Sequence, residues 1–206
     1  IAKPDYIISS WPKIIKNKVL AIPKYLVVGT HPSSLPMNQG RHPIHWMIAL
    51  GIPSTHLSFF AMDEGIDTGK ILLQIPVPIG NREINKINLD MNKCAYEGTT
   101  KLIKIFENDQ DYIGHEQSHQ FQNYWRKRNQ HDIIVDPRMN LDMLTRIVNS
   151  FAPPYPGAQL WIKSDKFLTI NKIKAACNKD YPPNWHNFEH GYIFFTSKEY
   201  LVMRIG

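Results

Sequence analysis

The sequence predicts an α/β domain followed by a small β domain. Two apolar strand patterns, at residues 5–9 and 25–28, flank a short amphipathic segment, and a strand–helix–strand unit of this kind connects neighbouring parallel strands. After residue 158, four short strand patterns follow one another without a long helix between them. The chain has 206 residues, 43% of them hydrophobic, which is enough for one or two packed domains.

Helices and strands alternate through the first half of the chain. A short helix is predicted from Pro12 to Pro23, and a second from Pro43 to Gly51, because proline suits the first turn of a helix and glycine its end. Residues 54–62 read as a strand. The apolar face of the first helix is expected to comprise Ile14, Ile15, Val19 and Leu20.

A further strand and the longest helix follow. Residues 69–79 predict a strand, and Pro76 and Pro78 place its second half at a sheet edge, because proline has no N–H to donate to a neighbouring strand. Residues 83–107 show apolar residues at helical spacing, and we expect this helix to cover the sheet. Gly98 within it weakens the helix modestly.

The second half of the chain changes in character. Residues 111–140, rich in Asn, Gln, Asp and His, are interpreted as a linker between domains over residues 1–110 and 141–206. A short amphipathic helix is predicted over 141–151, with Asn140 as its N-cap. A proline-rich turn then leads into the β region. The predicted strands are 159–163, 166–175, 191–196 and 199–205, the last two forming a hairpin.

The candidate catalytic residues lie between His31 and Gly69. His31 directly follows a predicted strand, and Asp67 lies in an acidic, glycine-containing loop that follows another. In open α/β sheets, ligands bind where strands end. A histidine that a nearby carboxylate can hold is a candidate general base.

These residues belong to an ordered set of motifs: His31-Pro-Ser33, Leu35-Pro36, Gly40-Arg41, Pro43-Ile44, Trp46 and Met62-Asp63-x-Gly65-x-Asp67-Thr68-Gly69. The set resembles the formyltransferases that use 10-formyltetrahydrofolate. This family includes methionyl-tRNA formyltransferase, the sugar-nucleotide formyltransferases and the hydrolase domain of formyltetrahydrofolate dehydrogenase. The resemblance implies that His31 and Asp67 are catalytic, at the family's separation of 36 positions.

One residue departs from the family pattern. The family carries an Asn two positions before the histidine, and this chain has Gly29 there. In the family that Asn is thought to stabilise the oxyanion on the attacked formyl carbon. The loss of one such donor typically costs roughly a hundred- to a thousandfold in rate.

The resemblance also implies the binding residues and the architecture. For the formyl donor, 10-formyltetrahydrofolate, these are Ser10, Trp11, Pro12, Ile15, Met62, Asp63, Glu64 and Gly65. Ser33 and Arg41 are predicted to bind substrate, and the Arg41 guanidinium, just after the catalytic loop, could meet a phosphate or the glutamate of the folate. The implied fold is a Rossmann-like catalytic domain, doubly wound, followed by a small OB-like β-barrel. In the family a further βαβ unit precedes the first strand, so we expect this chain to lack an N-terminal part. Tyr124-Trp125-x-Lys127-Arg128 resembles the segment that joins the two domains.

The implied reaction is transfer of a formyl group to a primary amine. The residue identities within these motifs resemble those of sugar-nucleotide formyltransferases, which favours a nucleotide-linked amino sugar as acceptor. The predicted barrel and the net charge of +6 favour methionyl-tRNA instead. Two other interpretations stay open. Gly29 motivates a non-catalytic folate- or nucleotide-binding protein, and water as acceptor would make the reaction a hydrolysis.

Other features of the sequence argue against a membrane protein and a zinc enzyme. No run of 18 apolar residues predicts a membrane span, and two cysteines without a disulfide framework suit a cytoplasmic protein. His115-Glu116-Gln117-Ser118-His119 fits the zinc-hydrolase pattern H-E-x-x-H, but no apolar face supports a helix there, so we expect no metal. We expect no membrane partner, and the sequence leaves the oligomeric state open.

Overall fold

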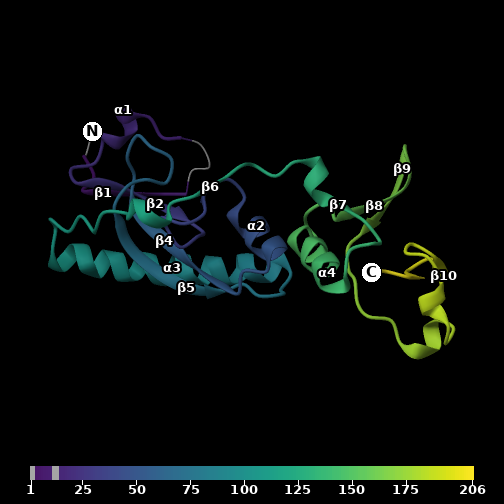
Figure 1. The fold of residues 1–206 in the computed structure, drawn as a ribbon. Helices are drawn as coiled ribbons and strands as arrows, with labels where there is room; N and C mark the ends of the chain where they lie inside the picture. Colours follow the sequence, from purple (N-terminus) through teal and green to yellow (C-terminus); the bar gives the residue numbers. More distant parts are fainter. Residues whose placement is uncertain (1–2, 11–13) are drawn as a thin grey trace. The chain divides into compact units, whose positions relative to one another are not determined.

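The computed structural model describes residues 3–10 and 14–206, which form two compact units (Figure 1). No helix within these described residues is both long and apolar enough to cross a bilayer. The first unit contains most of the chain up to Arg128, and the second contains the chain from Asn129 onward. Two earlier segments, Ile48–Gly51 and Asn81–Asn85, also cluster with the second unit.

A mixed four-stranded sheet forms the centre of the first unit. Its strands are β1 (Tyr6–Ser9), β2 (Leu26–His31), β4 (Ser54–Ala61) and β5 (Ile71–Pro78), in the order β1-β2-β4-β5. The β1–β2 pair is parallel, as the strand–helix–strand pattern predicts. The predicted Rossmann-like α/β class is confirmed, but the β2–β4 and β4–β5 pairs are antiparallel, so the described sheet is mixed rather than wholly parallel. β5 lies at its edge, in agreement with its two prolines.

Helix α3 (Ile84–Asn108) runs along this sheet (Figure 1) and buries an apolar stripe against it. Gly98 explains how closely the two pack. A Cβ at this position would lie 2.2 and 2.4 Å from ring carbons of Phe59, a fully buried residue of β4. The absence of a side chain at Gly98 therefore makes room for the Phe59 ring. The stripe consists of Ile84, Ile87, Met91, Leu102 and Phe106.

The helix expected after Pro12 is shorter than predicted. The described part is α1 (Asn17–Leu20), a single turn, and Pro12 lies outside the described residues. Its predicted apolar face is not buried, because Ile14 is 67% and Val19 is 40% exposed. The other two residues of the predicted face, Ile15 and Leu20, are half-buried, so spacing alone predicted more burial here than the structure has.

Two short elements follow His31 in the chain. β3 (Gln39–Gly40) pairs in parallel with β6 (Tyr124–Trp125), and α2 (Pro43–Leu50) follows directly. α2 begins at Pro43 and ends before Gly51, which has a positive φ of 72°, as the sequence predicts.

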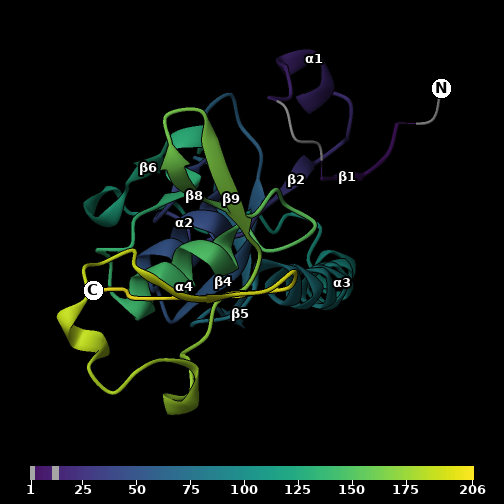
Figure 2. The same ribbon diagram turned by 90° about the vertical axis from the view of Figure 1, so that its right-hand side faces the viewer.

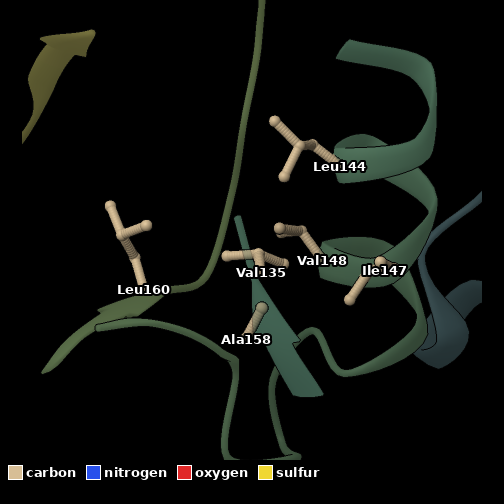
Figure 3. Close-up of a cluster of buried hydrophobic side chains, with 6 residues drawn as sticks. All are labelled: Val135, Leu144, Ile147, Val148, Ala158 and Leu160. Carbon is tan, nitrogen blue, oxygen red and sulfur yellow. The ribbon is translucent and has the colours of Figure 1, made fainter. Parts of the chain in front are cut away.

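The second unit packs helix α4 (Leu141–Ser150) against a three-stranded sheet of β7 (Ile134–Val135), β8 (Ala158–Lys163) and β9 (Lys166–Ile170). The predicted N-cap is confirmed: the Asn140 side chain accepts a hydrogen bond from the Met143 N–H at 2.8 Å. Figure 3 shows the apolar cluster between helix and sheet: Val135, Leu144, Ile147, Val148, Ala158 and Leu160.

The C-terminal hairpin is a separate sheet. β10 (Ile193–Thr196) and β11 (Leu201–Met203) pair antiparallel, as predicted, and do not join β8 and β9 (Figures 1 and 2). β9 ends at Ile170, five residues before its predicted end at 175. Because the described strands of this unit form two separate sheets, the structure contains no closed barrel within those residues, and the OB-like domain is not seen.

Candidate active site

Strand β2 ends at His31, where its side chain meets Asp67. The Nδ1 atom of His31 lies 3.4 Å from Oδ2 of Asp67, and the other ring nitrogen, Nε2, lies 3.0 Å from the carbonyl oxygen of Asn38. His31 is only 5% exposed. The two residues that the motif singled out are thus in contact, which is the arrangement of a histidine general base oriented by a carboxylate.

Asp67 is held by hydrogen bonds to both its side chain and its backbone. Its Oδ2 accepts from the Gly40 N–H at 3.0 Å, and its carbonyl oxygen accepts from the Gln39 and Gln117 side-chain amides at 2.9 and 2.8 Å. These contacts hold Asp67 at a φ of +57°, a backbone conformation that few residues other than glycine adopt. The surrounding chain therefore determines where the carboxylate points.

The loop between His31 and Gly40 is stabilised internally. Ser33, predicted to bind substrate, is fully buried, and its hydroxyl donates to the Met37 carbonyl at 2.8 Å. Its own carbonyl accepts from the Ser58 hydroxyl. Because the Ser33 side chain shapes the loop and has no exposed surface, we carry only Arg41, which is exposed, forward as a substrate-binding candidate.

The acidic loop is folded around Asp63. Its Oδ1 accepts from the Gly65 N–H at 3.0 Å and from the Thr68 hydroxyl at 2.8 Å. Next to it, the Asn17 side chain donates to Glu64. The loop after β4, predicted to bind the donor, therefore lies beside α1.

The described donor-site candidates are accessible to different degrees. Ser10, Asp63, Glu64 and Gly65 are exposed, whereas Ile15 and Met62 are half-buried. Trp11 and Pro12, also predicted to bind the donor, lie outside the described residues.

The position of the missing family Asn is closely packed. A Cβ at Gly29 would lie 2.8 Å from Cγ of Met62 and 2.9 Å from Cζ of Phe60. The space into which an asparagine side chain would begin to extend is therefore already occupied. Gly29 matches its neighbours Met62 and Phe60 rather than leaving a gap in the site.

An amide cluster beside the site was missed by sequence reasoning. Gln117 donates to the carbonyl oxygens of Asp67 and Gly69, at 2.8 and 2.7 Å. The Asn123 side chain accepts from the Asn38 N–H at 2.7 Å. These residues lie in a stretch that reads as a linker because it is rich in Gln and Asn, and no sequence signal ties it to residues 38–69.

Gln117 lies inside the H-E-x-x-H pattern, whose structure is not that of a zinc site. His115 forms an isolated bridge with Ile71, and Glu116 pairs with Lys70 at 3.2 Å. A helix begins only at His119, as the single 3₁₀ turn η1 (His119–Phe121). The two histidines therefore do not share a helical face, which the zinc pattern requires.

The chain is similar in sequence to known proteins. Residues 2–104, half of the chain, match the family model described as formyl transferase. Methionyl-tRNA formyltransferase from Prochlorococcus marinus is 29% identical over 91% of this chain and 60% of its own length. The same enzyme from Ehrlichia canis is 32% identical over 83% of this chain and 57% of its own length. The chain thus spans about 60% of the curated relatives it matches.

A solved structure shares the fold. WlaRD, described as a sugar 3N-formyl transferase in the presence of dTDP and 5-N-formyl-THF, superposes with a TM-score of 0.59 at 19% identity. The match covers 71% of this chain and 53% of that protein.

Proposed function

Because the chain belongs to the formyl transferase family, we propose that it transfers a formyl group from 10-formyltetrahydrofolate to a primary amine. The observation that carries the proposal is the contact between His31 and Asp67, two residues 36 positions apart that meet at the end of β2. A non-catalytic binding protein would have no need of a buried histidine held by a carboxylate.

In the proposed reaction, a neutral amine attacks the formyl carbon and a C–N bond forms. His31 accepts the proton that the amine loses, and the negative charge of Asp67 stabilises the imidazolium. The bond from the formyl carbon to N10 of the folate then breaks, and N10 receives the proton. Nδ1 faces Asp67 and Nε2 lies against the Asn38 carbonyl, which can only accept a hydrogen bond. For Nε2 to take the amine proton, the ring proton must be on Nδ1, where Asp67 accepts it, and the amine must replace the Asn38 carbonyl as the partner of Nε2.

The proposed donor site combines the segment around Ser10 and Ile15 with the loop from Met62 to Gly65. The hydrogen bond between Asn17 and Glu64 supports this assignment, because Asn17 lies only two residues after Ile15 in the chain. The WlaRD structure, which contains a formylated folate, supports the same class of donor.

Two acceptors fit the family. The residue identities within the motifs favour a nucleotide-linked amino sugar, and the sugar formyltransferase with the same fold supports that choice. The curated relatives favour methionyl-tRNA at least as well. The chain covers only part of those relatives, so the acceptor is decided by experiment.

The decisive experiment is a transfer assay on the intact protein. It is incubated with 10-formyltetrahydrofolate and either a nucleotide-linked amino sugar or methionyl-tRNA, and formylated product is detected by mass spectrometry. We expect product with one of the two acceptors and none with the His31→Ala variant. Folate binding without any product, including free formate, would support the non-catalytic alternative instead.

A further inference from the structure

A cluster of basic and aromatic side chains surrounds Trp46 on helix α2. The guanidinium groups of Arg126 and Arg128 lie 5.0 and 4.9 Å from the centre of the Trp46 ring, within the range of cation–π contacts. The Trp46 indole N–H donates to the Arg126 carbonyl at 2.9 Å. These contacts position the basic segment after β6 beside the start of α2.

The same segment is tied to the candidate active site. Gly40 pairs with Trp125 in the β3–β6 ladder, and the Arg41 N–H donates to the Trp125 carbonyl at 2.9 Å. The Gly40 N–H donates to the Asp67 carboxylate. One peptide unit therefore separates the residue that holds Asp67 from Arg41, so the basic cluster directly adjoins the site.

Two basic side chains of this region form no ion pair among the described residues. Arg41 and Lys127 are both exposed, and neither forms an ion pair with a carboxylate of the described residues. Nδ1 of His42 is buried without a hydrogen-bond partner. The β3–β6 ladder pairs Gly40 with Trp125, so Arg41 and Lys127 lie one and two residues beyond this pair. Burial, and then the charges of Lys127, Arg41 and Arg128, lower the pKa of His42.

We propose that Arg41 and Lys127, which follow the paired strands β3 and β6, bind a phosphate group of the acceptor substrate. The proposal rests on the proposed function, because the acceptor must place its amine at His31 while its phosphate lies at the cluster. Guanidinium and ammonium groups are the usual partners of phosphate in proteins. A nucleotide-linked sugar would supply the phosphate from its diphosphate, and a tRNA from its backbone.

Binding is tested on the intact protein without folate, by calorimetry with inorganic pyrophosphate, UDP and tRNA. We expect at least one of these probes to bind, with an affinity that falls as salt rises. The Arg41→Ala/Lys127→Ala double variant should bind it at least tenfold more weakly. Lys104→Ala, which removes an exposed lysine of α3, is the matched control and should bind as the wild type does. Circular dichroism confirms that each variant is folded.

The choice of probe distinguishes the two sources of phosphate. Binding of UDP and pyrophosphate alone indicates a nucleotide-linked acceptor, whereas binding of tRNA alone indicates a nucleic acid, and both depend on Arg41 and Lys127. Histidine NMR provides a second readout, because a bound anion should raise the pKa of His42. Equal binding by wild type and double variant, or binding of none of the three probes, overturns the proposal.

Steady-state kinetics separate this proposal from the reaction itself. The double variant should raise the acceptor KM at least tenfold and leave the folate KM unchanged. If transfer occurs and the acceptor KM does not change, the phosphate site is wrong and formyl transfer stands. If no acceptor is formylated but pyrophosphate binding still requires Arg41 and Lys127, the phosphate site stands and formyl transfer fails.

Discussion

The side chain of Gln117 donates a hydrogen bond to the carbonyl oxygen of Asp67, 2.8 Å away, although 50 positions separate the two residues. The same amide donates to Gly69 at 2.7 Å. Gln117 therefore fastens both sides of the turn that presents the Asp67 carboxylate to His31, and its contribution to the site is positional.

Replacement of Gln117 by alanine should lower turnover by loosening the turn that carries Asp67. Both carbonyls would lose a donor in a half-buried place, which typically costs about 1–3 kcal/mol locally. Asp67, held at a positive φ, would then move away from His31. We expect kcat to fall by roughly one to two orders of magnitude, following the same local free energy, and the folate KM to change little.

Gln120→Ala is the matched control for this variant, because Gln120 is an exposed amide three residues further along the chain. It should retain the kcat of the wild type. A Gln117→Ala enzyme with normal kcat would show that Gln39 alone holds the turn.

The proton-transfer pair is tested by two substitutions with different expected outcomes. His31→Ala should abolish transfer, because it removes the group that takes the amine proton. Asp67→Asn should keep folate binding and reduce turnover by roughly a hundredfold or more, since the imidazolium loses its charged partner. Single-turnover kinetics and folate calorimetry on the same preparations separate these effects. Transfer at the wild-type rate in His31→Ala would rule out the mechanism.

Restoring the family residue at Gly29 should not restore a stronger site. The Cβ of any new side chain would press on Met62 and Phe60, and overpacking of this kind typically costs about 1–3 kcal/mol. We expect Gly29→Asn to lower the melting temperature and to leave turnover unchanged or reduced. Thermal unfolding and kcat are the measurements.

Gly29→Ala is the steric control, because it adds the same Cβ without an amide. If Gly29→Asn turns over far faster than Gly29→Ala, by up to roughly a thousandfold, the amide does reach the oxyanion and the site lacks that donor at present.

Gly98→Ala should destabilise the fold even though alanine is the better helix former. The new methyl group would overlap the buried Phe59 ring, and this cost of about 1–3 kcal/mol exceeds or matches the gain of about 1 kcal/mol from helix propensity. Asn92→Ala, at an exposed position of the same helix, should be neutral or stabilising. Denaturant unfolding measures the stability of both variants. Adding Phe59→Leu to Gly98→Ala should reduce the overlap, because leucine is smaller than phenylalanine. A stabilised Gly98→Ala protein would contradict the packing described for α3.

The elements with strong periodicity could be predicted from the sequence, and the contacts across long separations could not. β4, β5, α3 and α4 lie within two residues of their predicted ranges, because burial of apolar residues determines both the local pattern and the structure. His31 and Asp67 were identified by an ordered motif. Gln117 was missed because one hydrogen bond across 50 positions leaves no local pattern.

The C-terminal region illustrates the opposite error. Residues 166–175 were interpreted as one long strand, and the family resemblance implied a barrel. In the structure β9 ends at Ile170 and β10 pairs only with β11 among the described strands. A local strand pattern does not specify which strand becomes the neighbour, so closure of a sheet cannot be predicted from it.

The two-residue ladder between β3 and β6 limits how the catalytic unit can be dissected. A fragment cut at residue 110 would lose Gln117, Asn123 and the strand that pairs with Gln39 and Gly40. Such a fragment could retain the central sheet and bury its apolar face while the turn that carries Asp67 is left without the hydrogen bonds from Gln117. A fragment that extends through Arg128 would keep every one of these partners, and recombinant expression of an isolated catalytic unit should begin from that limit.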